Sequence, residues 1–378
     1  MFRSRFVAKL LKILGAGLLT AILCSCTGAS SSKHKIAQIL LQYHRNGRFS
    51  GSVLVGYGDT VVYEGAFGCA DETWKVANTP LTRFQIGSLT KQFTAALILE
   101  LAQQGHIDLD ATLSAYIPDY RRDVADAVTI RQLLGHSAGV PDFVHRSDIM
   151  QIVKEPAMPR EVISKYCSNA LEFTPGTQFK YSNCGYLILG VLYERVTGES
   201  YADGLQRLTA RVGLTDTGIS GPRAIVPRLA TAYVVENGQQ MKAPYIDWSV
   251  AFSSGAVYST VRDLWRWRNE LLAGRVLGAG AVKEIFALRP FGYSFGWHVG
   301  RTDPAQLRTF LVSDYDAQPT ANNANLLLAS HSGDLAGSHS CMTLFLDGTW
   351  TVILLDNHDS KSLPNLAAEI LNALLIKF

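Results

Sequence analysis

Ser88 and Lys91 are the two side chains of this sequence whose spacing best fits nucleophilic catalysis. They lie where an extended segment, residues 84–86, gives way to a predicted helix over residues 91–104. On the first turn of a helix, side chains three residues apart share one face, so the Lys91 ammonium can reach the Ser88 hydroxyl. A serine hydroxyl becomes a nucleophile when a base removes its proton, and the positive end of a helix dipole favours a neutral lysine. The pair therefore predicts a serine nucleophile with a lysine base.

The Ser-x-x-Lys spacing alone is weak evidence for an active site. It recurs at Ser30 and Lys33 and again at Ser32 and Lys35, in a short polar segment where it has no chemical meaning. A functional interpretation of Ser88 therefore needs further polar residues that complete a site.

Tyr181 and Asn183 form the second candidate cluster, in the segment Tyr181-Ser182-Asn183 that follows a Pro175-Gly176 turn. A tyrosine phenol near cations can carry protons, and an asparagine amide can donate to a substrate carbonyl while it accepts from a lysine. The structural alternative is a core tyrosine beside an asparagine that caps the following helix. The segment therefore indicates an active site only in combination with Ser88 and Lys91.

His331-Ser332-Gly333 is the third candidate, because it follows the apolar strand over residues 325–330 and precedes a glycine-containing turn. A glycine in a strand lets a ligand lie against the backbone. His298-Val299-Gly300 has the same spacing, but no glycine-rich turn precedes its next strand. We therefore interpret His298 as a core or edge histidine.

The expected secondary structure places these candidates between two hairpins. One hairpin is predicted at each end of the chain, with turns at residues 57–59 and at Asp347-Gly348. A final helix begins at Ser362-Leu363-Pro364. One sheet assembled from both chain ends, with a helical lobe inserted within it, is the expected architecture. Further helices are predicted at residues 36–43, 91–104, 130–134, 186–196 and 261–272.

The combined motifs resemble the penicillin-recognising serine hydrolases, in the branch that contains class C β-lactamases, D-alanyl-D-alanine carboxypeptidases, D-aminopeptidases and related esterases. Segments 133–142 and 255–264 support the resemblance, which extends over nearly all of the mature chain in family order. The resemblance implies an α+β fold, in which an antiparallel sheet with covering helices lies beside a mainly helical lobe. A single two-lobed domain over residues 36–378 is expected, with an α/β lobe at about 36–90 and 285–378 and a helical lobe at about 91–284.

The same resemblance implies a role for each matching residue. Ser88 would be the nucleophile, Lys91 its proton partner, and Tyr181 the base that later protonates the leaving group. Asn183 would orient Lys91 and the substrate carbonyl. The backbone N–H groups of Ser88 and Asp334 would form the oxyanion hole, which stabilises the tetrahedral intermediate by about 3–4 kcal/mol per donor. The implied reaction proceeds through an acyl-enzyme and uses neither a metal nor an organic cofactor.

His331 and Asp334 distinguish this chain from the β-lactamases that it resembles. Those enzymes usually carry a lysine at the position of His331, and no Lys-x-Gly occurs anywhere in this sequence. A lysine is a permanent cation for a substrate carboxylate, whereas an imidazole is mostly neutral at pH 7. Asp334 adds a carboxylate beside that position, where Gly333 is expected to border the substrate. Both differences weaken the case for an anionic substrate.

The sequence therefore favours an exported serine hydrolase that forms an acyl-enzyme on Ser88. The preferred substrate classes are small esters and D-amino-acid peptides or amides. A true class C-like β-lactamase or D-Ala-D-Ala carboxypeptidase is the alternative within the family. A non-catalytic receptor for peptidoglycan fragments or β-lactams is the alternative from another class, and the intact Ser88, Lys91, Tyr181 and Asn183 argue against it.

Composition and charge exclude other classes of function. The 378 residues include 35 Lys and Arg against 32 Asp and Glu, a formal charge of +3 that is too balanced for a nucleic-acid binder. With 47% hydrophobic and 18% charged residues, the chain can bury a large globular core. The sequence indicates no protein partner.

Residues 1–25 are predicted to be a lipoprotein signal peptide. Four cations precede an uncharged run over residues 13–24, which is too short to span a bilayer. The run ends in Leu23-Cys24-Ser25-Cys26, which resembles the bacterial lipoprotein box in which Cys26 receives the lipid. The alternative is an ordinary cleavage site followed by a spare cysteine. With residues 26–35 as a flexible tether, the expectation is a lipoprotein held to a membrane of the bacterial cell envelope.

Four cysteines remain in the predicted mature domain: Cys69, Cys167, Cys184 and Cys341. They form no Cys-x-x-Cys pair and lie near no histidine cluster, so a zinc site is not expected. An exported protein can form disulfides, and four cysteines allow three pairings. Cys167 and Cys184 bracket the loop that carries Tyr181, and the alternatives for them are a disulfide or two buried thiols.

Overall fold

The computed structural model describes residues 31–219, 221, 224–312, 324–360 and 362–375. The predicted signal peptide over residues 1–25 and the predicted lipidation site Cys26 lie outside the described residues. The predicted tether over residues 26–35 lies partly outside them, and its residues 31–35 belong to a helix that continues to residue 45. In the part of the chain that the structure describes, no helix is long and apolar enough to cross a membrane.

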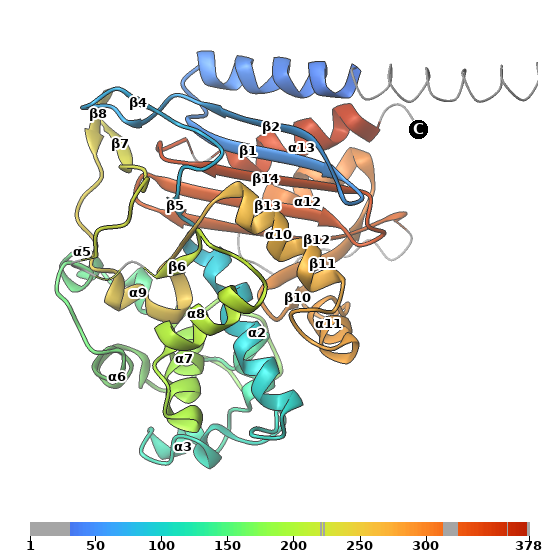
Figure 1. The fold of residues 1–378 in the computed structure, drawn as a ribbon. Coiled ribbons are helices and arrows are strands. Elements are labelled where there is room, and N and C mark those ends of the chain that lie inside the picture. The colour runs from blue at the N-terminus through green and yellow to red at the C-terminus, as the bar shows by residue number, and fades with distance from the viewer. Residues whose placement is uncertain (1–30, 220, 222–223, 313–323, 361, 376–378) are drawn as a thin grey trace, which may run out of the picture.

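A seven-stranded sheet assembled from both ends of the chain forms the centre of the molecule, as the sequence predicts (Figure 1). Its order is β10-β11-β12-β13-β14-β1-β2, and all neighbouring strands are antiparallel. The N-terminal strand β1 pairs directly with β14, so neither chain end can form the sheet alone. The strands are β1 (Gly51–Tyr57), β2 (Thr60–Phe67), β10 (Tyr293–Ser294), β11 (Trp297–Thr302), β12 (Leu326–Leu335), β13 (Ser338–Phe345) and β14 (Trp350–Asp356).

The central strands are buried on both faces of the sheet. Successive side chains of strand β1 point to opposite faces of the sheet. Leu54 packs into the core shared with the helical lobe, while Val53 and Val55 pack into a second core on the other face. The second core lies under the N-terminal helix, α12 (Leu307–Val312) and α13 (Leu363–Leu375) (Figure 1). Strands buried on both faces read as continuous apolar runs, which explains the apolar sequence of β14.

The helical lobe is built around α2 (Thr90–Gln103), as Figure 1 shows. The sequence predicts this helix with one apolar stripe, but every residue from Thr90 to Leu101 is buried. The helix is therefore enclosed on all sides, by α7, α8 and α9 among others. The other main helices are α4 (Ile130–Leu134), α7 (Asn183–Thr197), α8 (Tyr201–Arg211), α9 (Trp248–Gly255), α10 (Val261–Leu272) and α11 (Ala279–Ile285).

Short elements connect the two lobes and line the space between them. A 3-10 turn, η1 (Gly87–Leu89), leads into α2, and strand β5 (Phe84–Gln85) joins β9 (Val257–Ser259) and β6 (Gly218–Ile219) in a small sheet. Two further hairpins pair β3 (Cys69–Asp71) with β4 (Val76–Ala77) and β7 (Tyr233–Glu236) with β8 (Gln239–Lys242). The remaining short helices are η2 (Leu113–Ala115), α3 (Arg122–Ala125), η3 (Phe143–His145), α5 (Ile149–Ile152), α6 (Pro159–Val162), η4 (Ile163–Cys167) and η5 (Pro304–Gln306).

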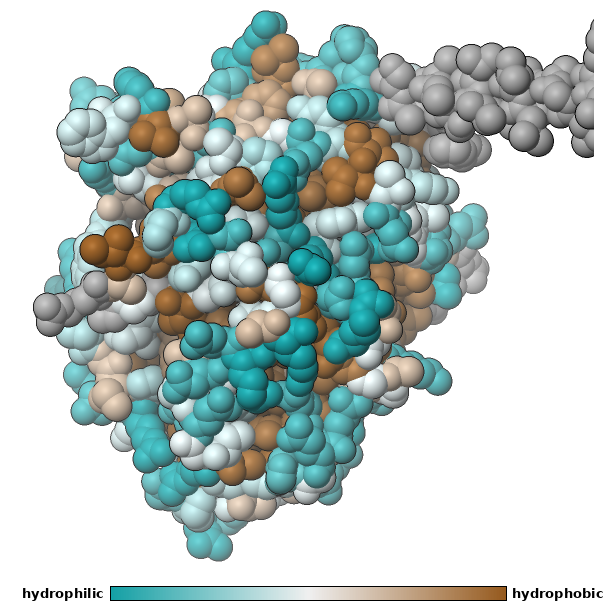
Figure 2. All heavy atoms as spheres, in the orientation of Figure 1, coloured by the Kyte–Doolittle hydropathy of each residue, from teal (hydrophilic) through white to brown (hydrophobic). Residues whose placement is uncertain are grey.

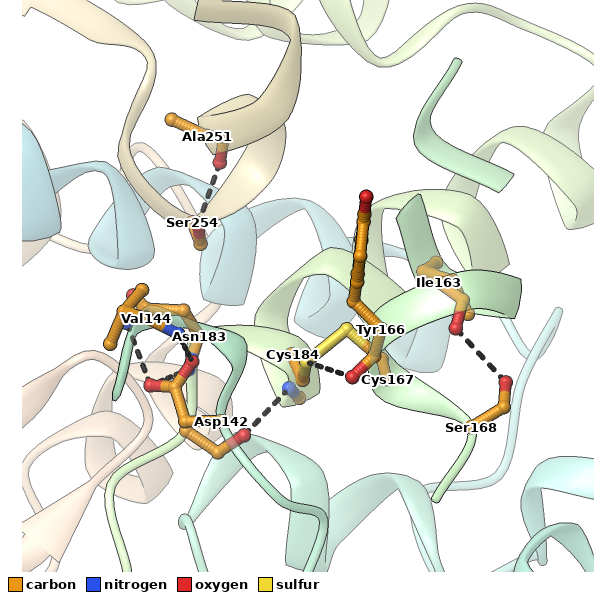
Figure 3. Close-up of a disulfide and its surroundings, with 12 residues drawn as sticks. Asp142, Val144, Ile163, Tyr166, Cys167, Ser168, Asn183, Cys184, Ala251 and Ser254 are labelled. Carbon is orange, nitrogen blue, oxygen red and sulfur yellow. Dashed lines mark hydrogen bonds between the residues drawn. A yellow bond between two sulfur atoms is a disulfide. The ribbon is translucent and has the colours of Figure 1, made fainter. Parts of the chain in front are cut away.

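Cys167 and Cys184 form a disulfide, which decides between the two alternatives that the sequence leaves open (Figure 3). The bond joins the end of η4 to the first turn of α7. Cys69 and Cys341 are free thiols. Burial raises the pKa of the Cys341 thiol to about 11, so this thiol stays protonated at neutral pH.

Candidate active site

Ser88 is the partly exposed residue of an otherwise buried turn. Ile86, Gly87, Leu89 and Thr90 are all buried around it. Gly87 has a φ of +52°, a left-handed conformation that glycine adopts without strain, and this turn brings the chain from β5 into α2. The Thr90 hydroxyl accepts a hydrogen bond from the backbone N–H of Val257 at 3.1 Å, which anchors the start of the helix. Ser88 is thus held rigidly at the wall of a pocket.

Lys91 is fully buried and donates to three oxygens. Its Nζ lies 3.1 Å from the Ser88 Oγ, 2.7 Å from the Asn183 Oδ1 and 2.8 Å from the backbone carbonyl of Ser254. Burial lowers the pKa of Lys91 to about 7, and the Asp142 carboxylate opposes this shift. An amine with a pKa near 7 is partly neutral at physiological pH, and its lone pair can then accept a proton.

The Tyr181 ring faces Lys91, with the Lys91 Nζ 4.8 Å from the ring centroid. The ring also packs against His136, with 4.2 Å between the two centroids. The His136 Nδ1 accepts from the Ser182 N–H at 3.2 Å, so Nε2 carries the imidazole proton. Burial and then the nearby Lys91 charge lower the pKa of His136 well below its ordinary value. The imidazole that packs against Tyr181 is therefore neutral.

Asn183 is the first residue of α7, three residues earlier than the predicted helix start. The helix cap is Ser182, whose hydroxyl accepts from the Gly185 N–H at 3.3 Å, so the interpretation of Asn183 as a cap is wrong. Asn183 instead connects Lys91 to Asp142, because its Nδ2 donates to the Asp142 Oδ2 at 2.9 Å (Figure 3). Sequence reasoning missed Asp142 and His136 as site residues, although both fall in segment 133–142, which carries the family resemblance.

The backbones of Gly333 and Asp334 pack directly against the Ser88 turn. A Cβ atom placed on Gly333 would lie 2.1 Å from the Ile86 carbonyl oxygen and 2.9 Å from the Ser88 nitrogen. A Cβ atom on Gly87 would lie 3.2 Å from the Asp334 nitrogen. Strand β12 can therefore approach the turn only with glycine at these two positions. The approach brings the two backbone N–H groups of the predicted oxyanion hole close together, and both residues line the pocket.

His331 does not face the pocket. It is 1% exposed and is absent from the residues that line the pocket. Its Nδ1 bonds the Ser332 carbonyl at 2.6 Å, so Nε2 accepts from the Tyr293 hydroxyl at 3.0 Å. Burial lowers the pKa of His331 well below its ordinary value, so the ring is neutral. The structure therefore places His331 behind the wall, where it supports the wall without direct contact with the pocket. His298 is also buried, which fits its interpretation as a core histidine.

The Asp334 carboxyl group, which the sequence predicts to add negative charge at the site, is paired with His339. The His339 Nδ1 lies 2.7 Å from the Asp334 Oδ1, and the His339 Nε2 lies 3.5 Å from Asp359. Burial lowers the pKa of His339, but the hydrogen bond to Asp334 and the neighbouring carboxylates outweigh burial and raise this pKa above its ordinary value. The raised pKa favours the protonated imidazole, whose charge offsets that of the Asp334 carboxylate.

The pocket beside Ser88 has a volume of about 450 Å³. Figure 2 shows polar and apolar side chains mixed over one face of the molecule. The pocket lining is mainly apolar, which is typical of sites for small molecules. Lys180 also lines the pocket, and its ammonium pairs with Glu172 at 2.6 Å. Across residues 31–375, where described, no group of three or more His, Cys, Asp or Glu side chains could hold a metal ion. The apolar lining includes Phe143, Ile149, Val153, Ile246, Val250 and Leu335.

Comparison with known proteins identifies the family. Residues 35–375 match the protein family Beta-lactamase. The chain belongs to the beta-lactamase family. This family comprises serine hydrolases that share the beta-lactamase fold. Penicillin-binding protein 4* of Bacillus subtilis (strain 168) is 25% identical over 343 residues, which cover 83% of this chain and 69% of that protein. Protein flp of Staphylococcus aureus is 30% identical over 176 residues, which cover 46% of this chain and 35% of that protein.

Solved structures confirm the predicted fold of this beta-lactamase family member. The penicillin binding protein from Bacillus halodurans superposes with a TM-score of 0.71 at 20% identity, over 90% of this chain and 100% of that chain. The D-amino acid amidase from Ochrobactrum anthropi SV3, complexed with D-phenylalanine, superposes with a TM-score of 0.75 at 24% identity, over 92% of this chain and 100% of that chain. The α+β prediction and the family resemblance are both confirmed.

Proposed function

We propose that this protein hydrolyses small esters or D-amino-acid amides through an acyl-enzyme on Ser88. The observation that carries the proposal is the Ser88 Oγ at 3.1 Å from a buried amine whose pKa is about 7. A serine beside a base that is partly neutral at pH 7 is an activated nucleophile. The chain's D-amino acid amidase structural neighbours support the amide substrate class.

In the proposed acylation, neutral Lys91 accepts the Ser88 hydroxyl proton while Oγ forms a bond to the substrate carbonyl carbon. The N–H groups of Ser88 and Asp334 donate to the oxyanion. The bond to the leaving amine or alcohol then breaks, and Tyr181 delivers a proton to that leaving group while it recovers one from Lys91. In deacylation, Lys91 takes a proton from a water molecule whose oxygen bonds the acyl carbon. The ester bond between that carbon and the Ser88 Oγ then breaks, and Lys91 returns the proton to Oγ.

The charges around the pocket support neutral substrates over anionic ones. The cation that a lysine would supply at position 331 is replaced by a neutral, buried imidazole. Asp142 and Asp334 both line the pocket, whereas the lining cation Lys180 is engaged by Glu172. A substrate carboxylate would have to compete with Glu172 for Lys180. A class C-like β-lactamase or D-Ala-D-Ala carboxypeptidase is therefore the second candidate, with Lys180 as its anion-binding residue.

A serine-directed phosphonate and a substrate panel test the proposal. The expected adduct lies on the peptide that contains Ser88, and Ser88→Ala should abolish both the adduct and the turnover of a p-nitrophenyl ester. Ser114→Ala is the matched control, because Ser114 is a partly buried serine outside the pocket. The panel compares neutral esters, D-amino-acid amides, D-Ala-D-Ala peptides and a chromogenic cephalosporin. Faster turnover of the cephalosporin than of any neutral substrate would reverse the ranking, and stoichiometric trapping without turnover would indicate a receptor.

We further propose that the protein is exported and anchored through a lipid on Cys26. The lipoprotein-like segment that ends at Cys26 supports this proposal. Cys26→Ser should release the protein from the membrane fraction or leave it unprocessed, and Cys69→Ser should leave its distribution unchanged. Lipid labelling that survives Cys26→Ser would refute the anchor.

A further inference from the structure

Asp142 lies at the end of a hydrogen-bonded chain that starts at the nucleophile. Its Oδ2 accepts from both the backbone N–H of Asn183 at 3.0 Å and the Asn183 Nδ2 at 2.9 Å. Its other oxygen, Oδ1, accepts from the Val144 N–H at 3.3 Å. Figure 3 shows the Asp142 and Asn183 side chains directed toward each other across the start of α7. Three backbone or side-chain donors thus fix the plane of this carboxylate.

The carboxylate determines which way the Asn183 amide points. In the observed orientation, the amide oxygen accepts from the Lys91 Nζ at 2.7 Å and the amide nitrogen donates to Asp142. The flipped orientation would set the amide nitrogen against the Lys91 donor and the amide oxygen against a carboxylate oxygen. Both of those contacts are repulsive, so Asp142 and Lys91 together select one amide orientation. One amide hydrogen is used by Asp142, and the other remains for a substrate carbonyl.

We propose that Asp142 is a positioning residue of the catalytic site, which locks the Asn183 amide and supplies the counter-charge at the end of the Ser88–Lys91–Asn183 chain. The inference rests on the proposed acyl-enzyme function. Asp142 also caps η3 through Val144, so a purely structural role is the competing explanation. The two explanations differ in their consequences for Asp142→Asn, because asparagine preserves the cap but removes the charge that acts on Lys91.

A carboxylate, two tyrosine rings and two imidazoles surround Lys91. Asp142 is the carboxylate that acts on it, and it favours the protonated amine. The Tyr181 and Tyr186 rings lie 4.8 Å and 5.5 Å from Nζ. His136 and His331 interact electrostatically with Lys91, and both imidazoles are neutral. Removal of the Asp142 charge should therefore lower the pKa of Lys91, the opposite of what exposure of the lysine to water would cause.

The test uses two variants of Asp142 and a charge-matched control. Asp142→Asn keeps the shape and an acceptor for Val144, since asparagine is also a good cap, but removes the charge. Asp142→Ala removes both. Asp148→Asn is the control, because Asp148 follows six residues later and its carboxylate pairs with Arg146 outside the pocket. Thermal unfolding confirms that each variant is folded before kinetics are measured.

In Asp142→Asn, the acidic limb of kcat/KM should move to lower pH by roughly half a unit or more. In Asp142→Ala, kcat/KM at the pH optimum should fall about 10²-fold through loss of amide orientation, and Asp148→Asn should do neither. The Lys91 pKa is also read without turnover, from the 13Cε chemical shifts of labelled lysines, with Lys91→Met for assignment. A titration midpoint of Lys91 that is the same in wild type and Asp142→Asn overturns the inference, whatever the melting temperatures. Absence of a Ser88 adduct in wild type instead overturns the proposed function, and the lysine titration still decides the role of Asp142.

Discussion

Lys91 is the residue whose chemistry depends most on its surroundings. In water its amine would be protonated at pH 7, but complete burial lowers its pKa to about 7. The proposed nucleophile Ser88 is therefore activated by the packing of the helical lobe as much as by the identity of the lysine.

The pH dependence of catalysis should reveal this lysine. Since the neutral amine accepts the Ser88 proton and the pKa is about 7, kcat/KM should decline about tenfold per pH unit below that value. Lys91→Ala should lower kcat/KM about 10³-fold and remove this acidic limb. Stopped-flow acylation over pH 5–9 measures both effects. A wild-type profile that is flat between pH 5 and 8 would contradict the assignment.

Tyr181 provides an independent prediction at the same scale. Its ring contacts both Lys91 and His136, and Tyr181→Phe keeps this ring and removes only the hydroxyl. We expect kcat to fall about 10²-fold or more with little change in KM, because proton transfer to the leaving group is lost. Steady-state kinetics with amide substrates measure the changes in kcat and in KM separately. A change in KM alone would mean that Tyr181 is a packing residue.

At the scale of elements, the disulfide restrains the loop that carries Tyr181 and Asn183. Cys184 follows Asn183 in the first turn of α7, and Cys167 ends η4 at a sequence separation of 17. The double variant Cys167→Ser, Cys184→Ser should lose about 3 kcal/mol of unfolding free energy, because the unfolded chain gains freedom. Urea unfolding measures the loss, and Cys69→Ser, at a free thiol, is the control. Equal midpoints for the double variant and wild type would show that the bond contributes no stability.

The close packing of strand β12 against the turn η1, which carries Ser88, also depends on how elements are arranged. A Cβ atom on Gly333 would lie 2.1 Å from the Ile86 carbonyl, so Gly333→Ala must separate the strand from the Ser88 turn. Phosphonate labelling of Ser88 should slow about 10²-fold, because the two N–H groups no longer converge. Gly280→Ala is the matched control, since a Cβ atom there meets no atom within 4 Å. Labelling at the wild-type rate in Gly333→Ala would show that the two N–H groups do not act together.

At the scale of the whole molecule, the sheet separates two cores. The first joins the sheet to the helical lobe around α2, and the second lies under the N-terminal helix and α13. The pairing of β1 with β14 joins the two end segments within the sheet, and the N-terminal helix and α13 pack on the second core. We therefore expect that substitutions in the second core lower stability without changing the Ser88 site.

Leu371→Ala tests this separation. Leu371 is fully buried in the second core, so the substitution should lower the unfolding free energy by about 2–5 kcal/mol. The folded fraction should keep the wild-type rate of Ser88 labelling, because α13 contributes no residue to the pocket. Leu375→Ala, at a partly buried position of the same helix, should be milder. A loss of labelling in fully folded Leu371→Ala would show that the two cores are coupled.

The family, the architecture and the identity of the central residues could be predicted from the sequence. Local signals suffice for these features: alternating apolar strands around turn dipeptides predict the hairpins, and Ser88, Lys91, Tyr181 and Asn183 lie in compact motifs. The arrangement of these residues could not be predicted from the sequence, because it depends on how distant elements pack. In the folded protein, Lys91 is buried and His331 contacts Tyr293 instead of the pocket. Asp334 pairs with His339, and Asp142 accepts a hydrogen bond from Asn183. Burial, side-chain direction and pairing across sequence separations such as 41 residues depend on how distant elements pack, and no local pattern encodes them.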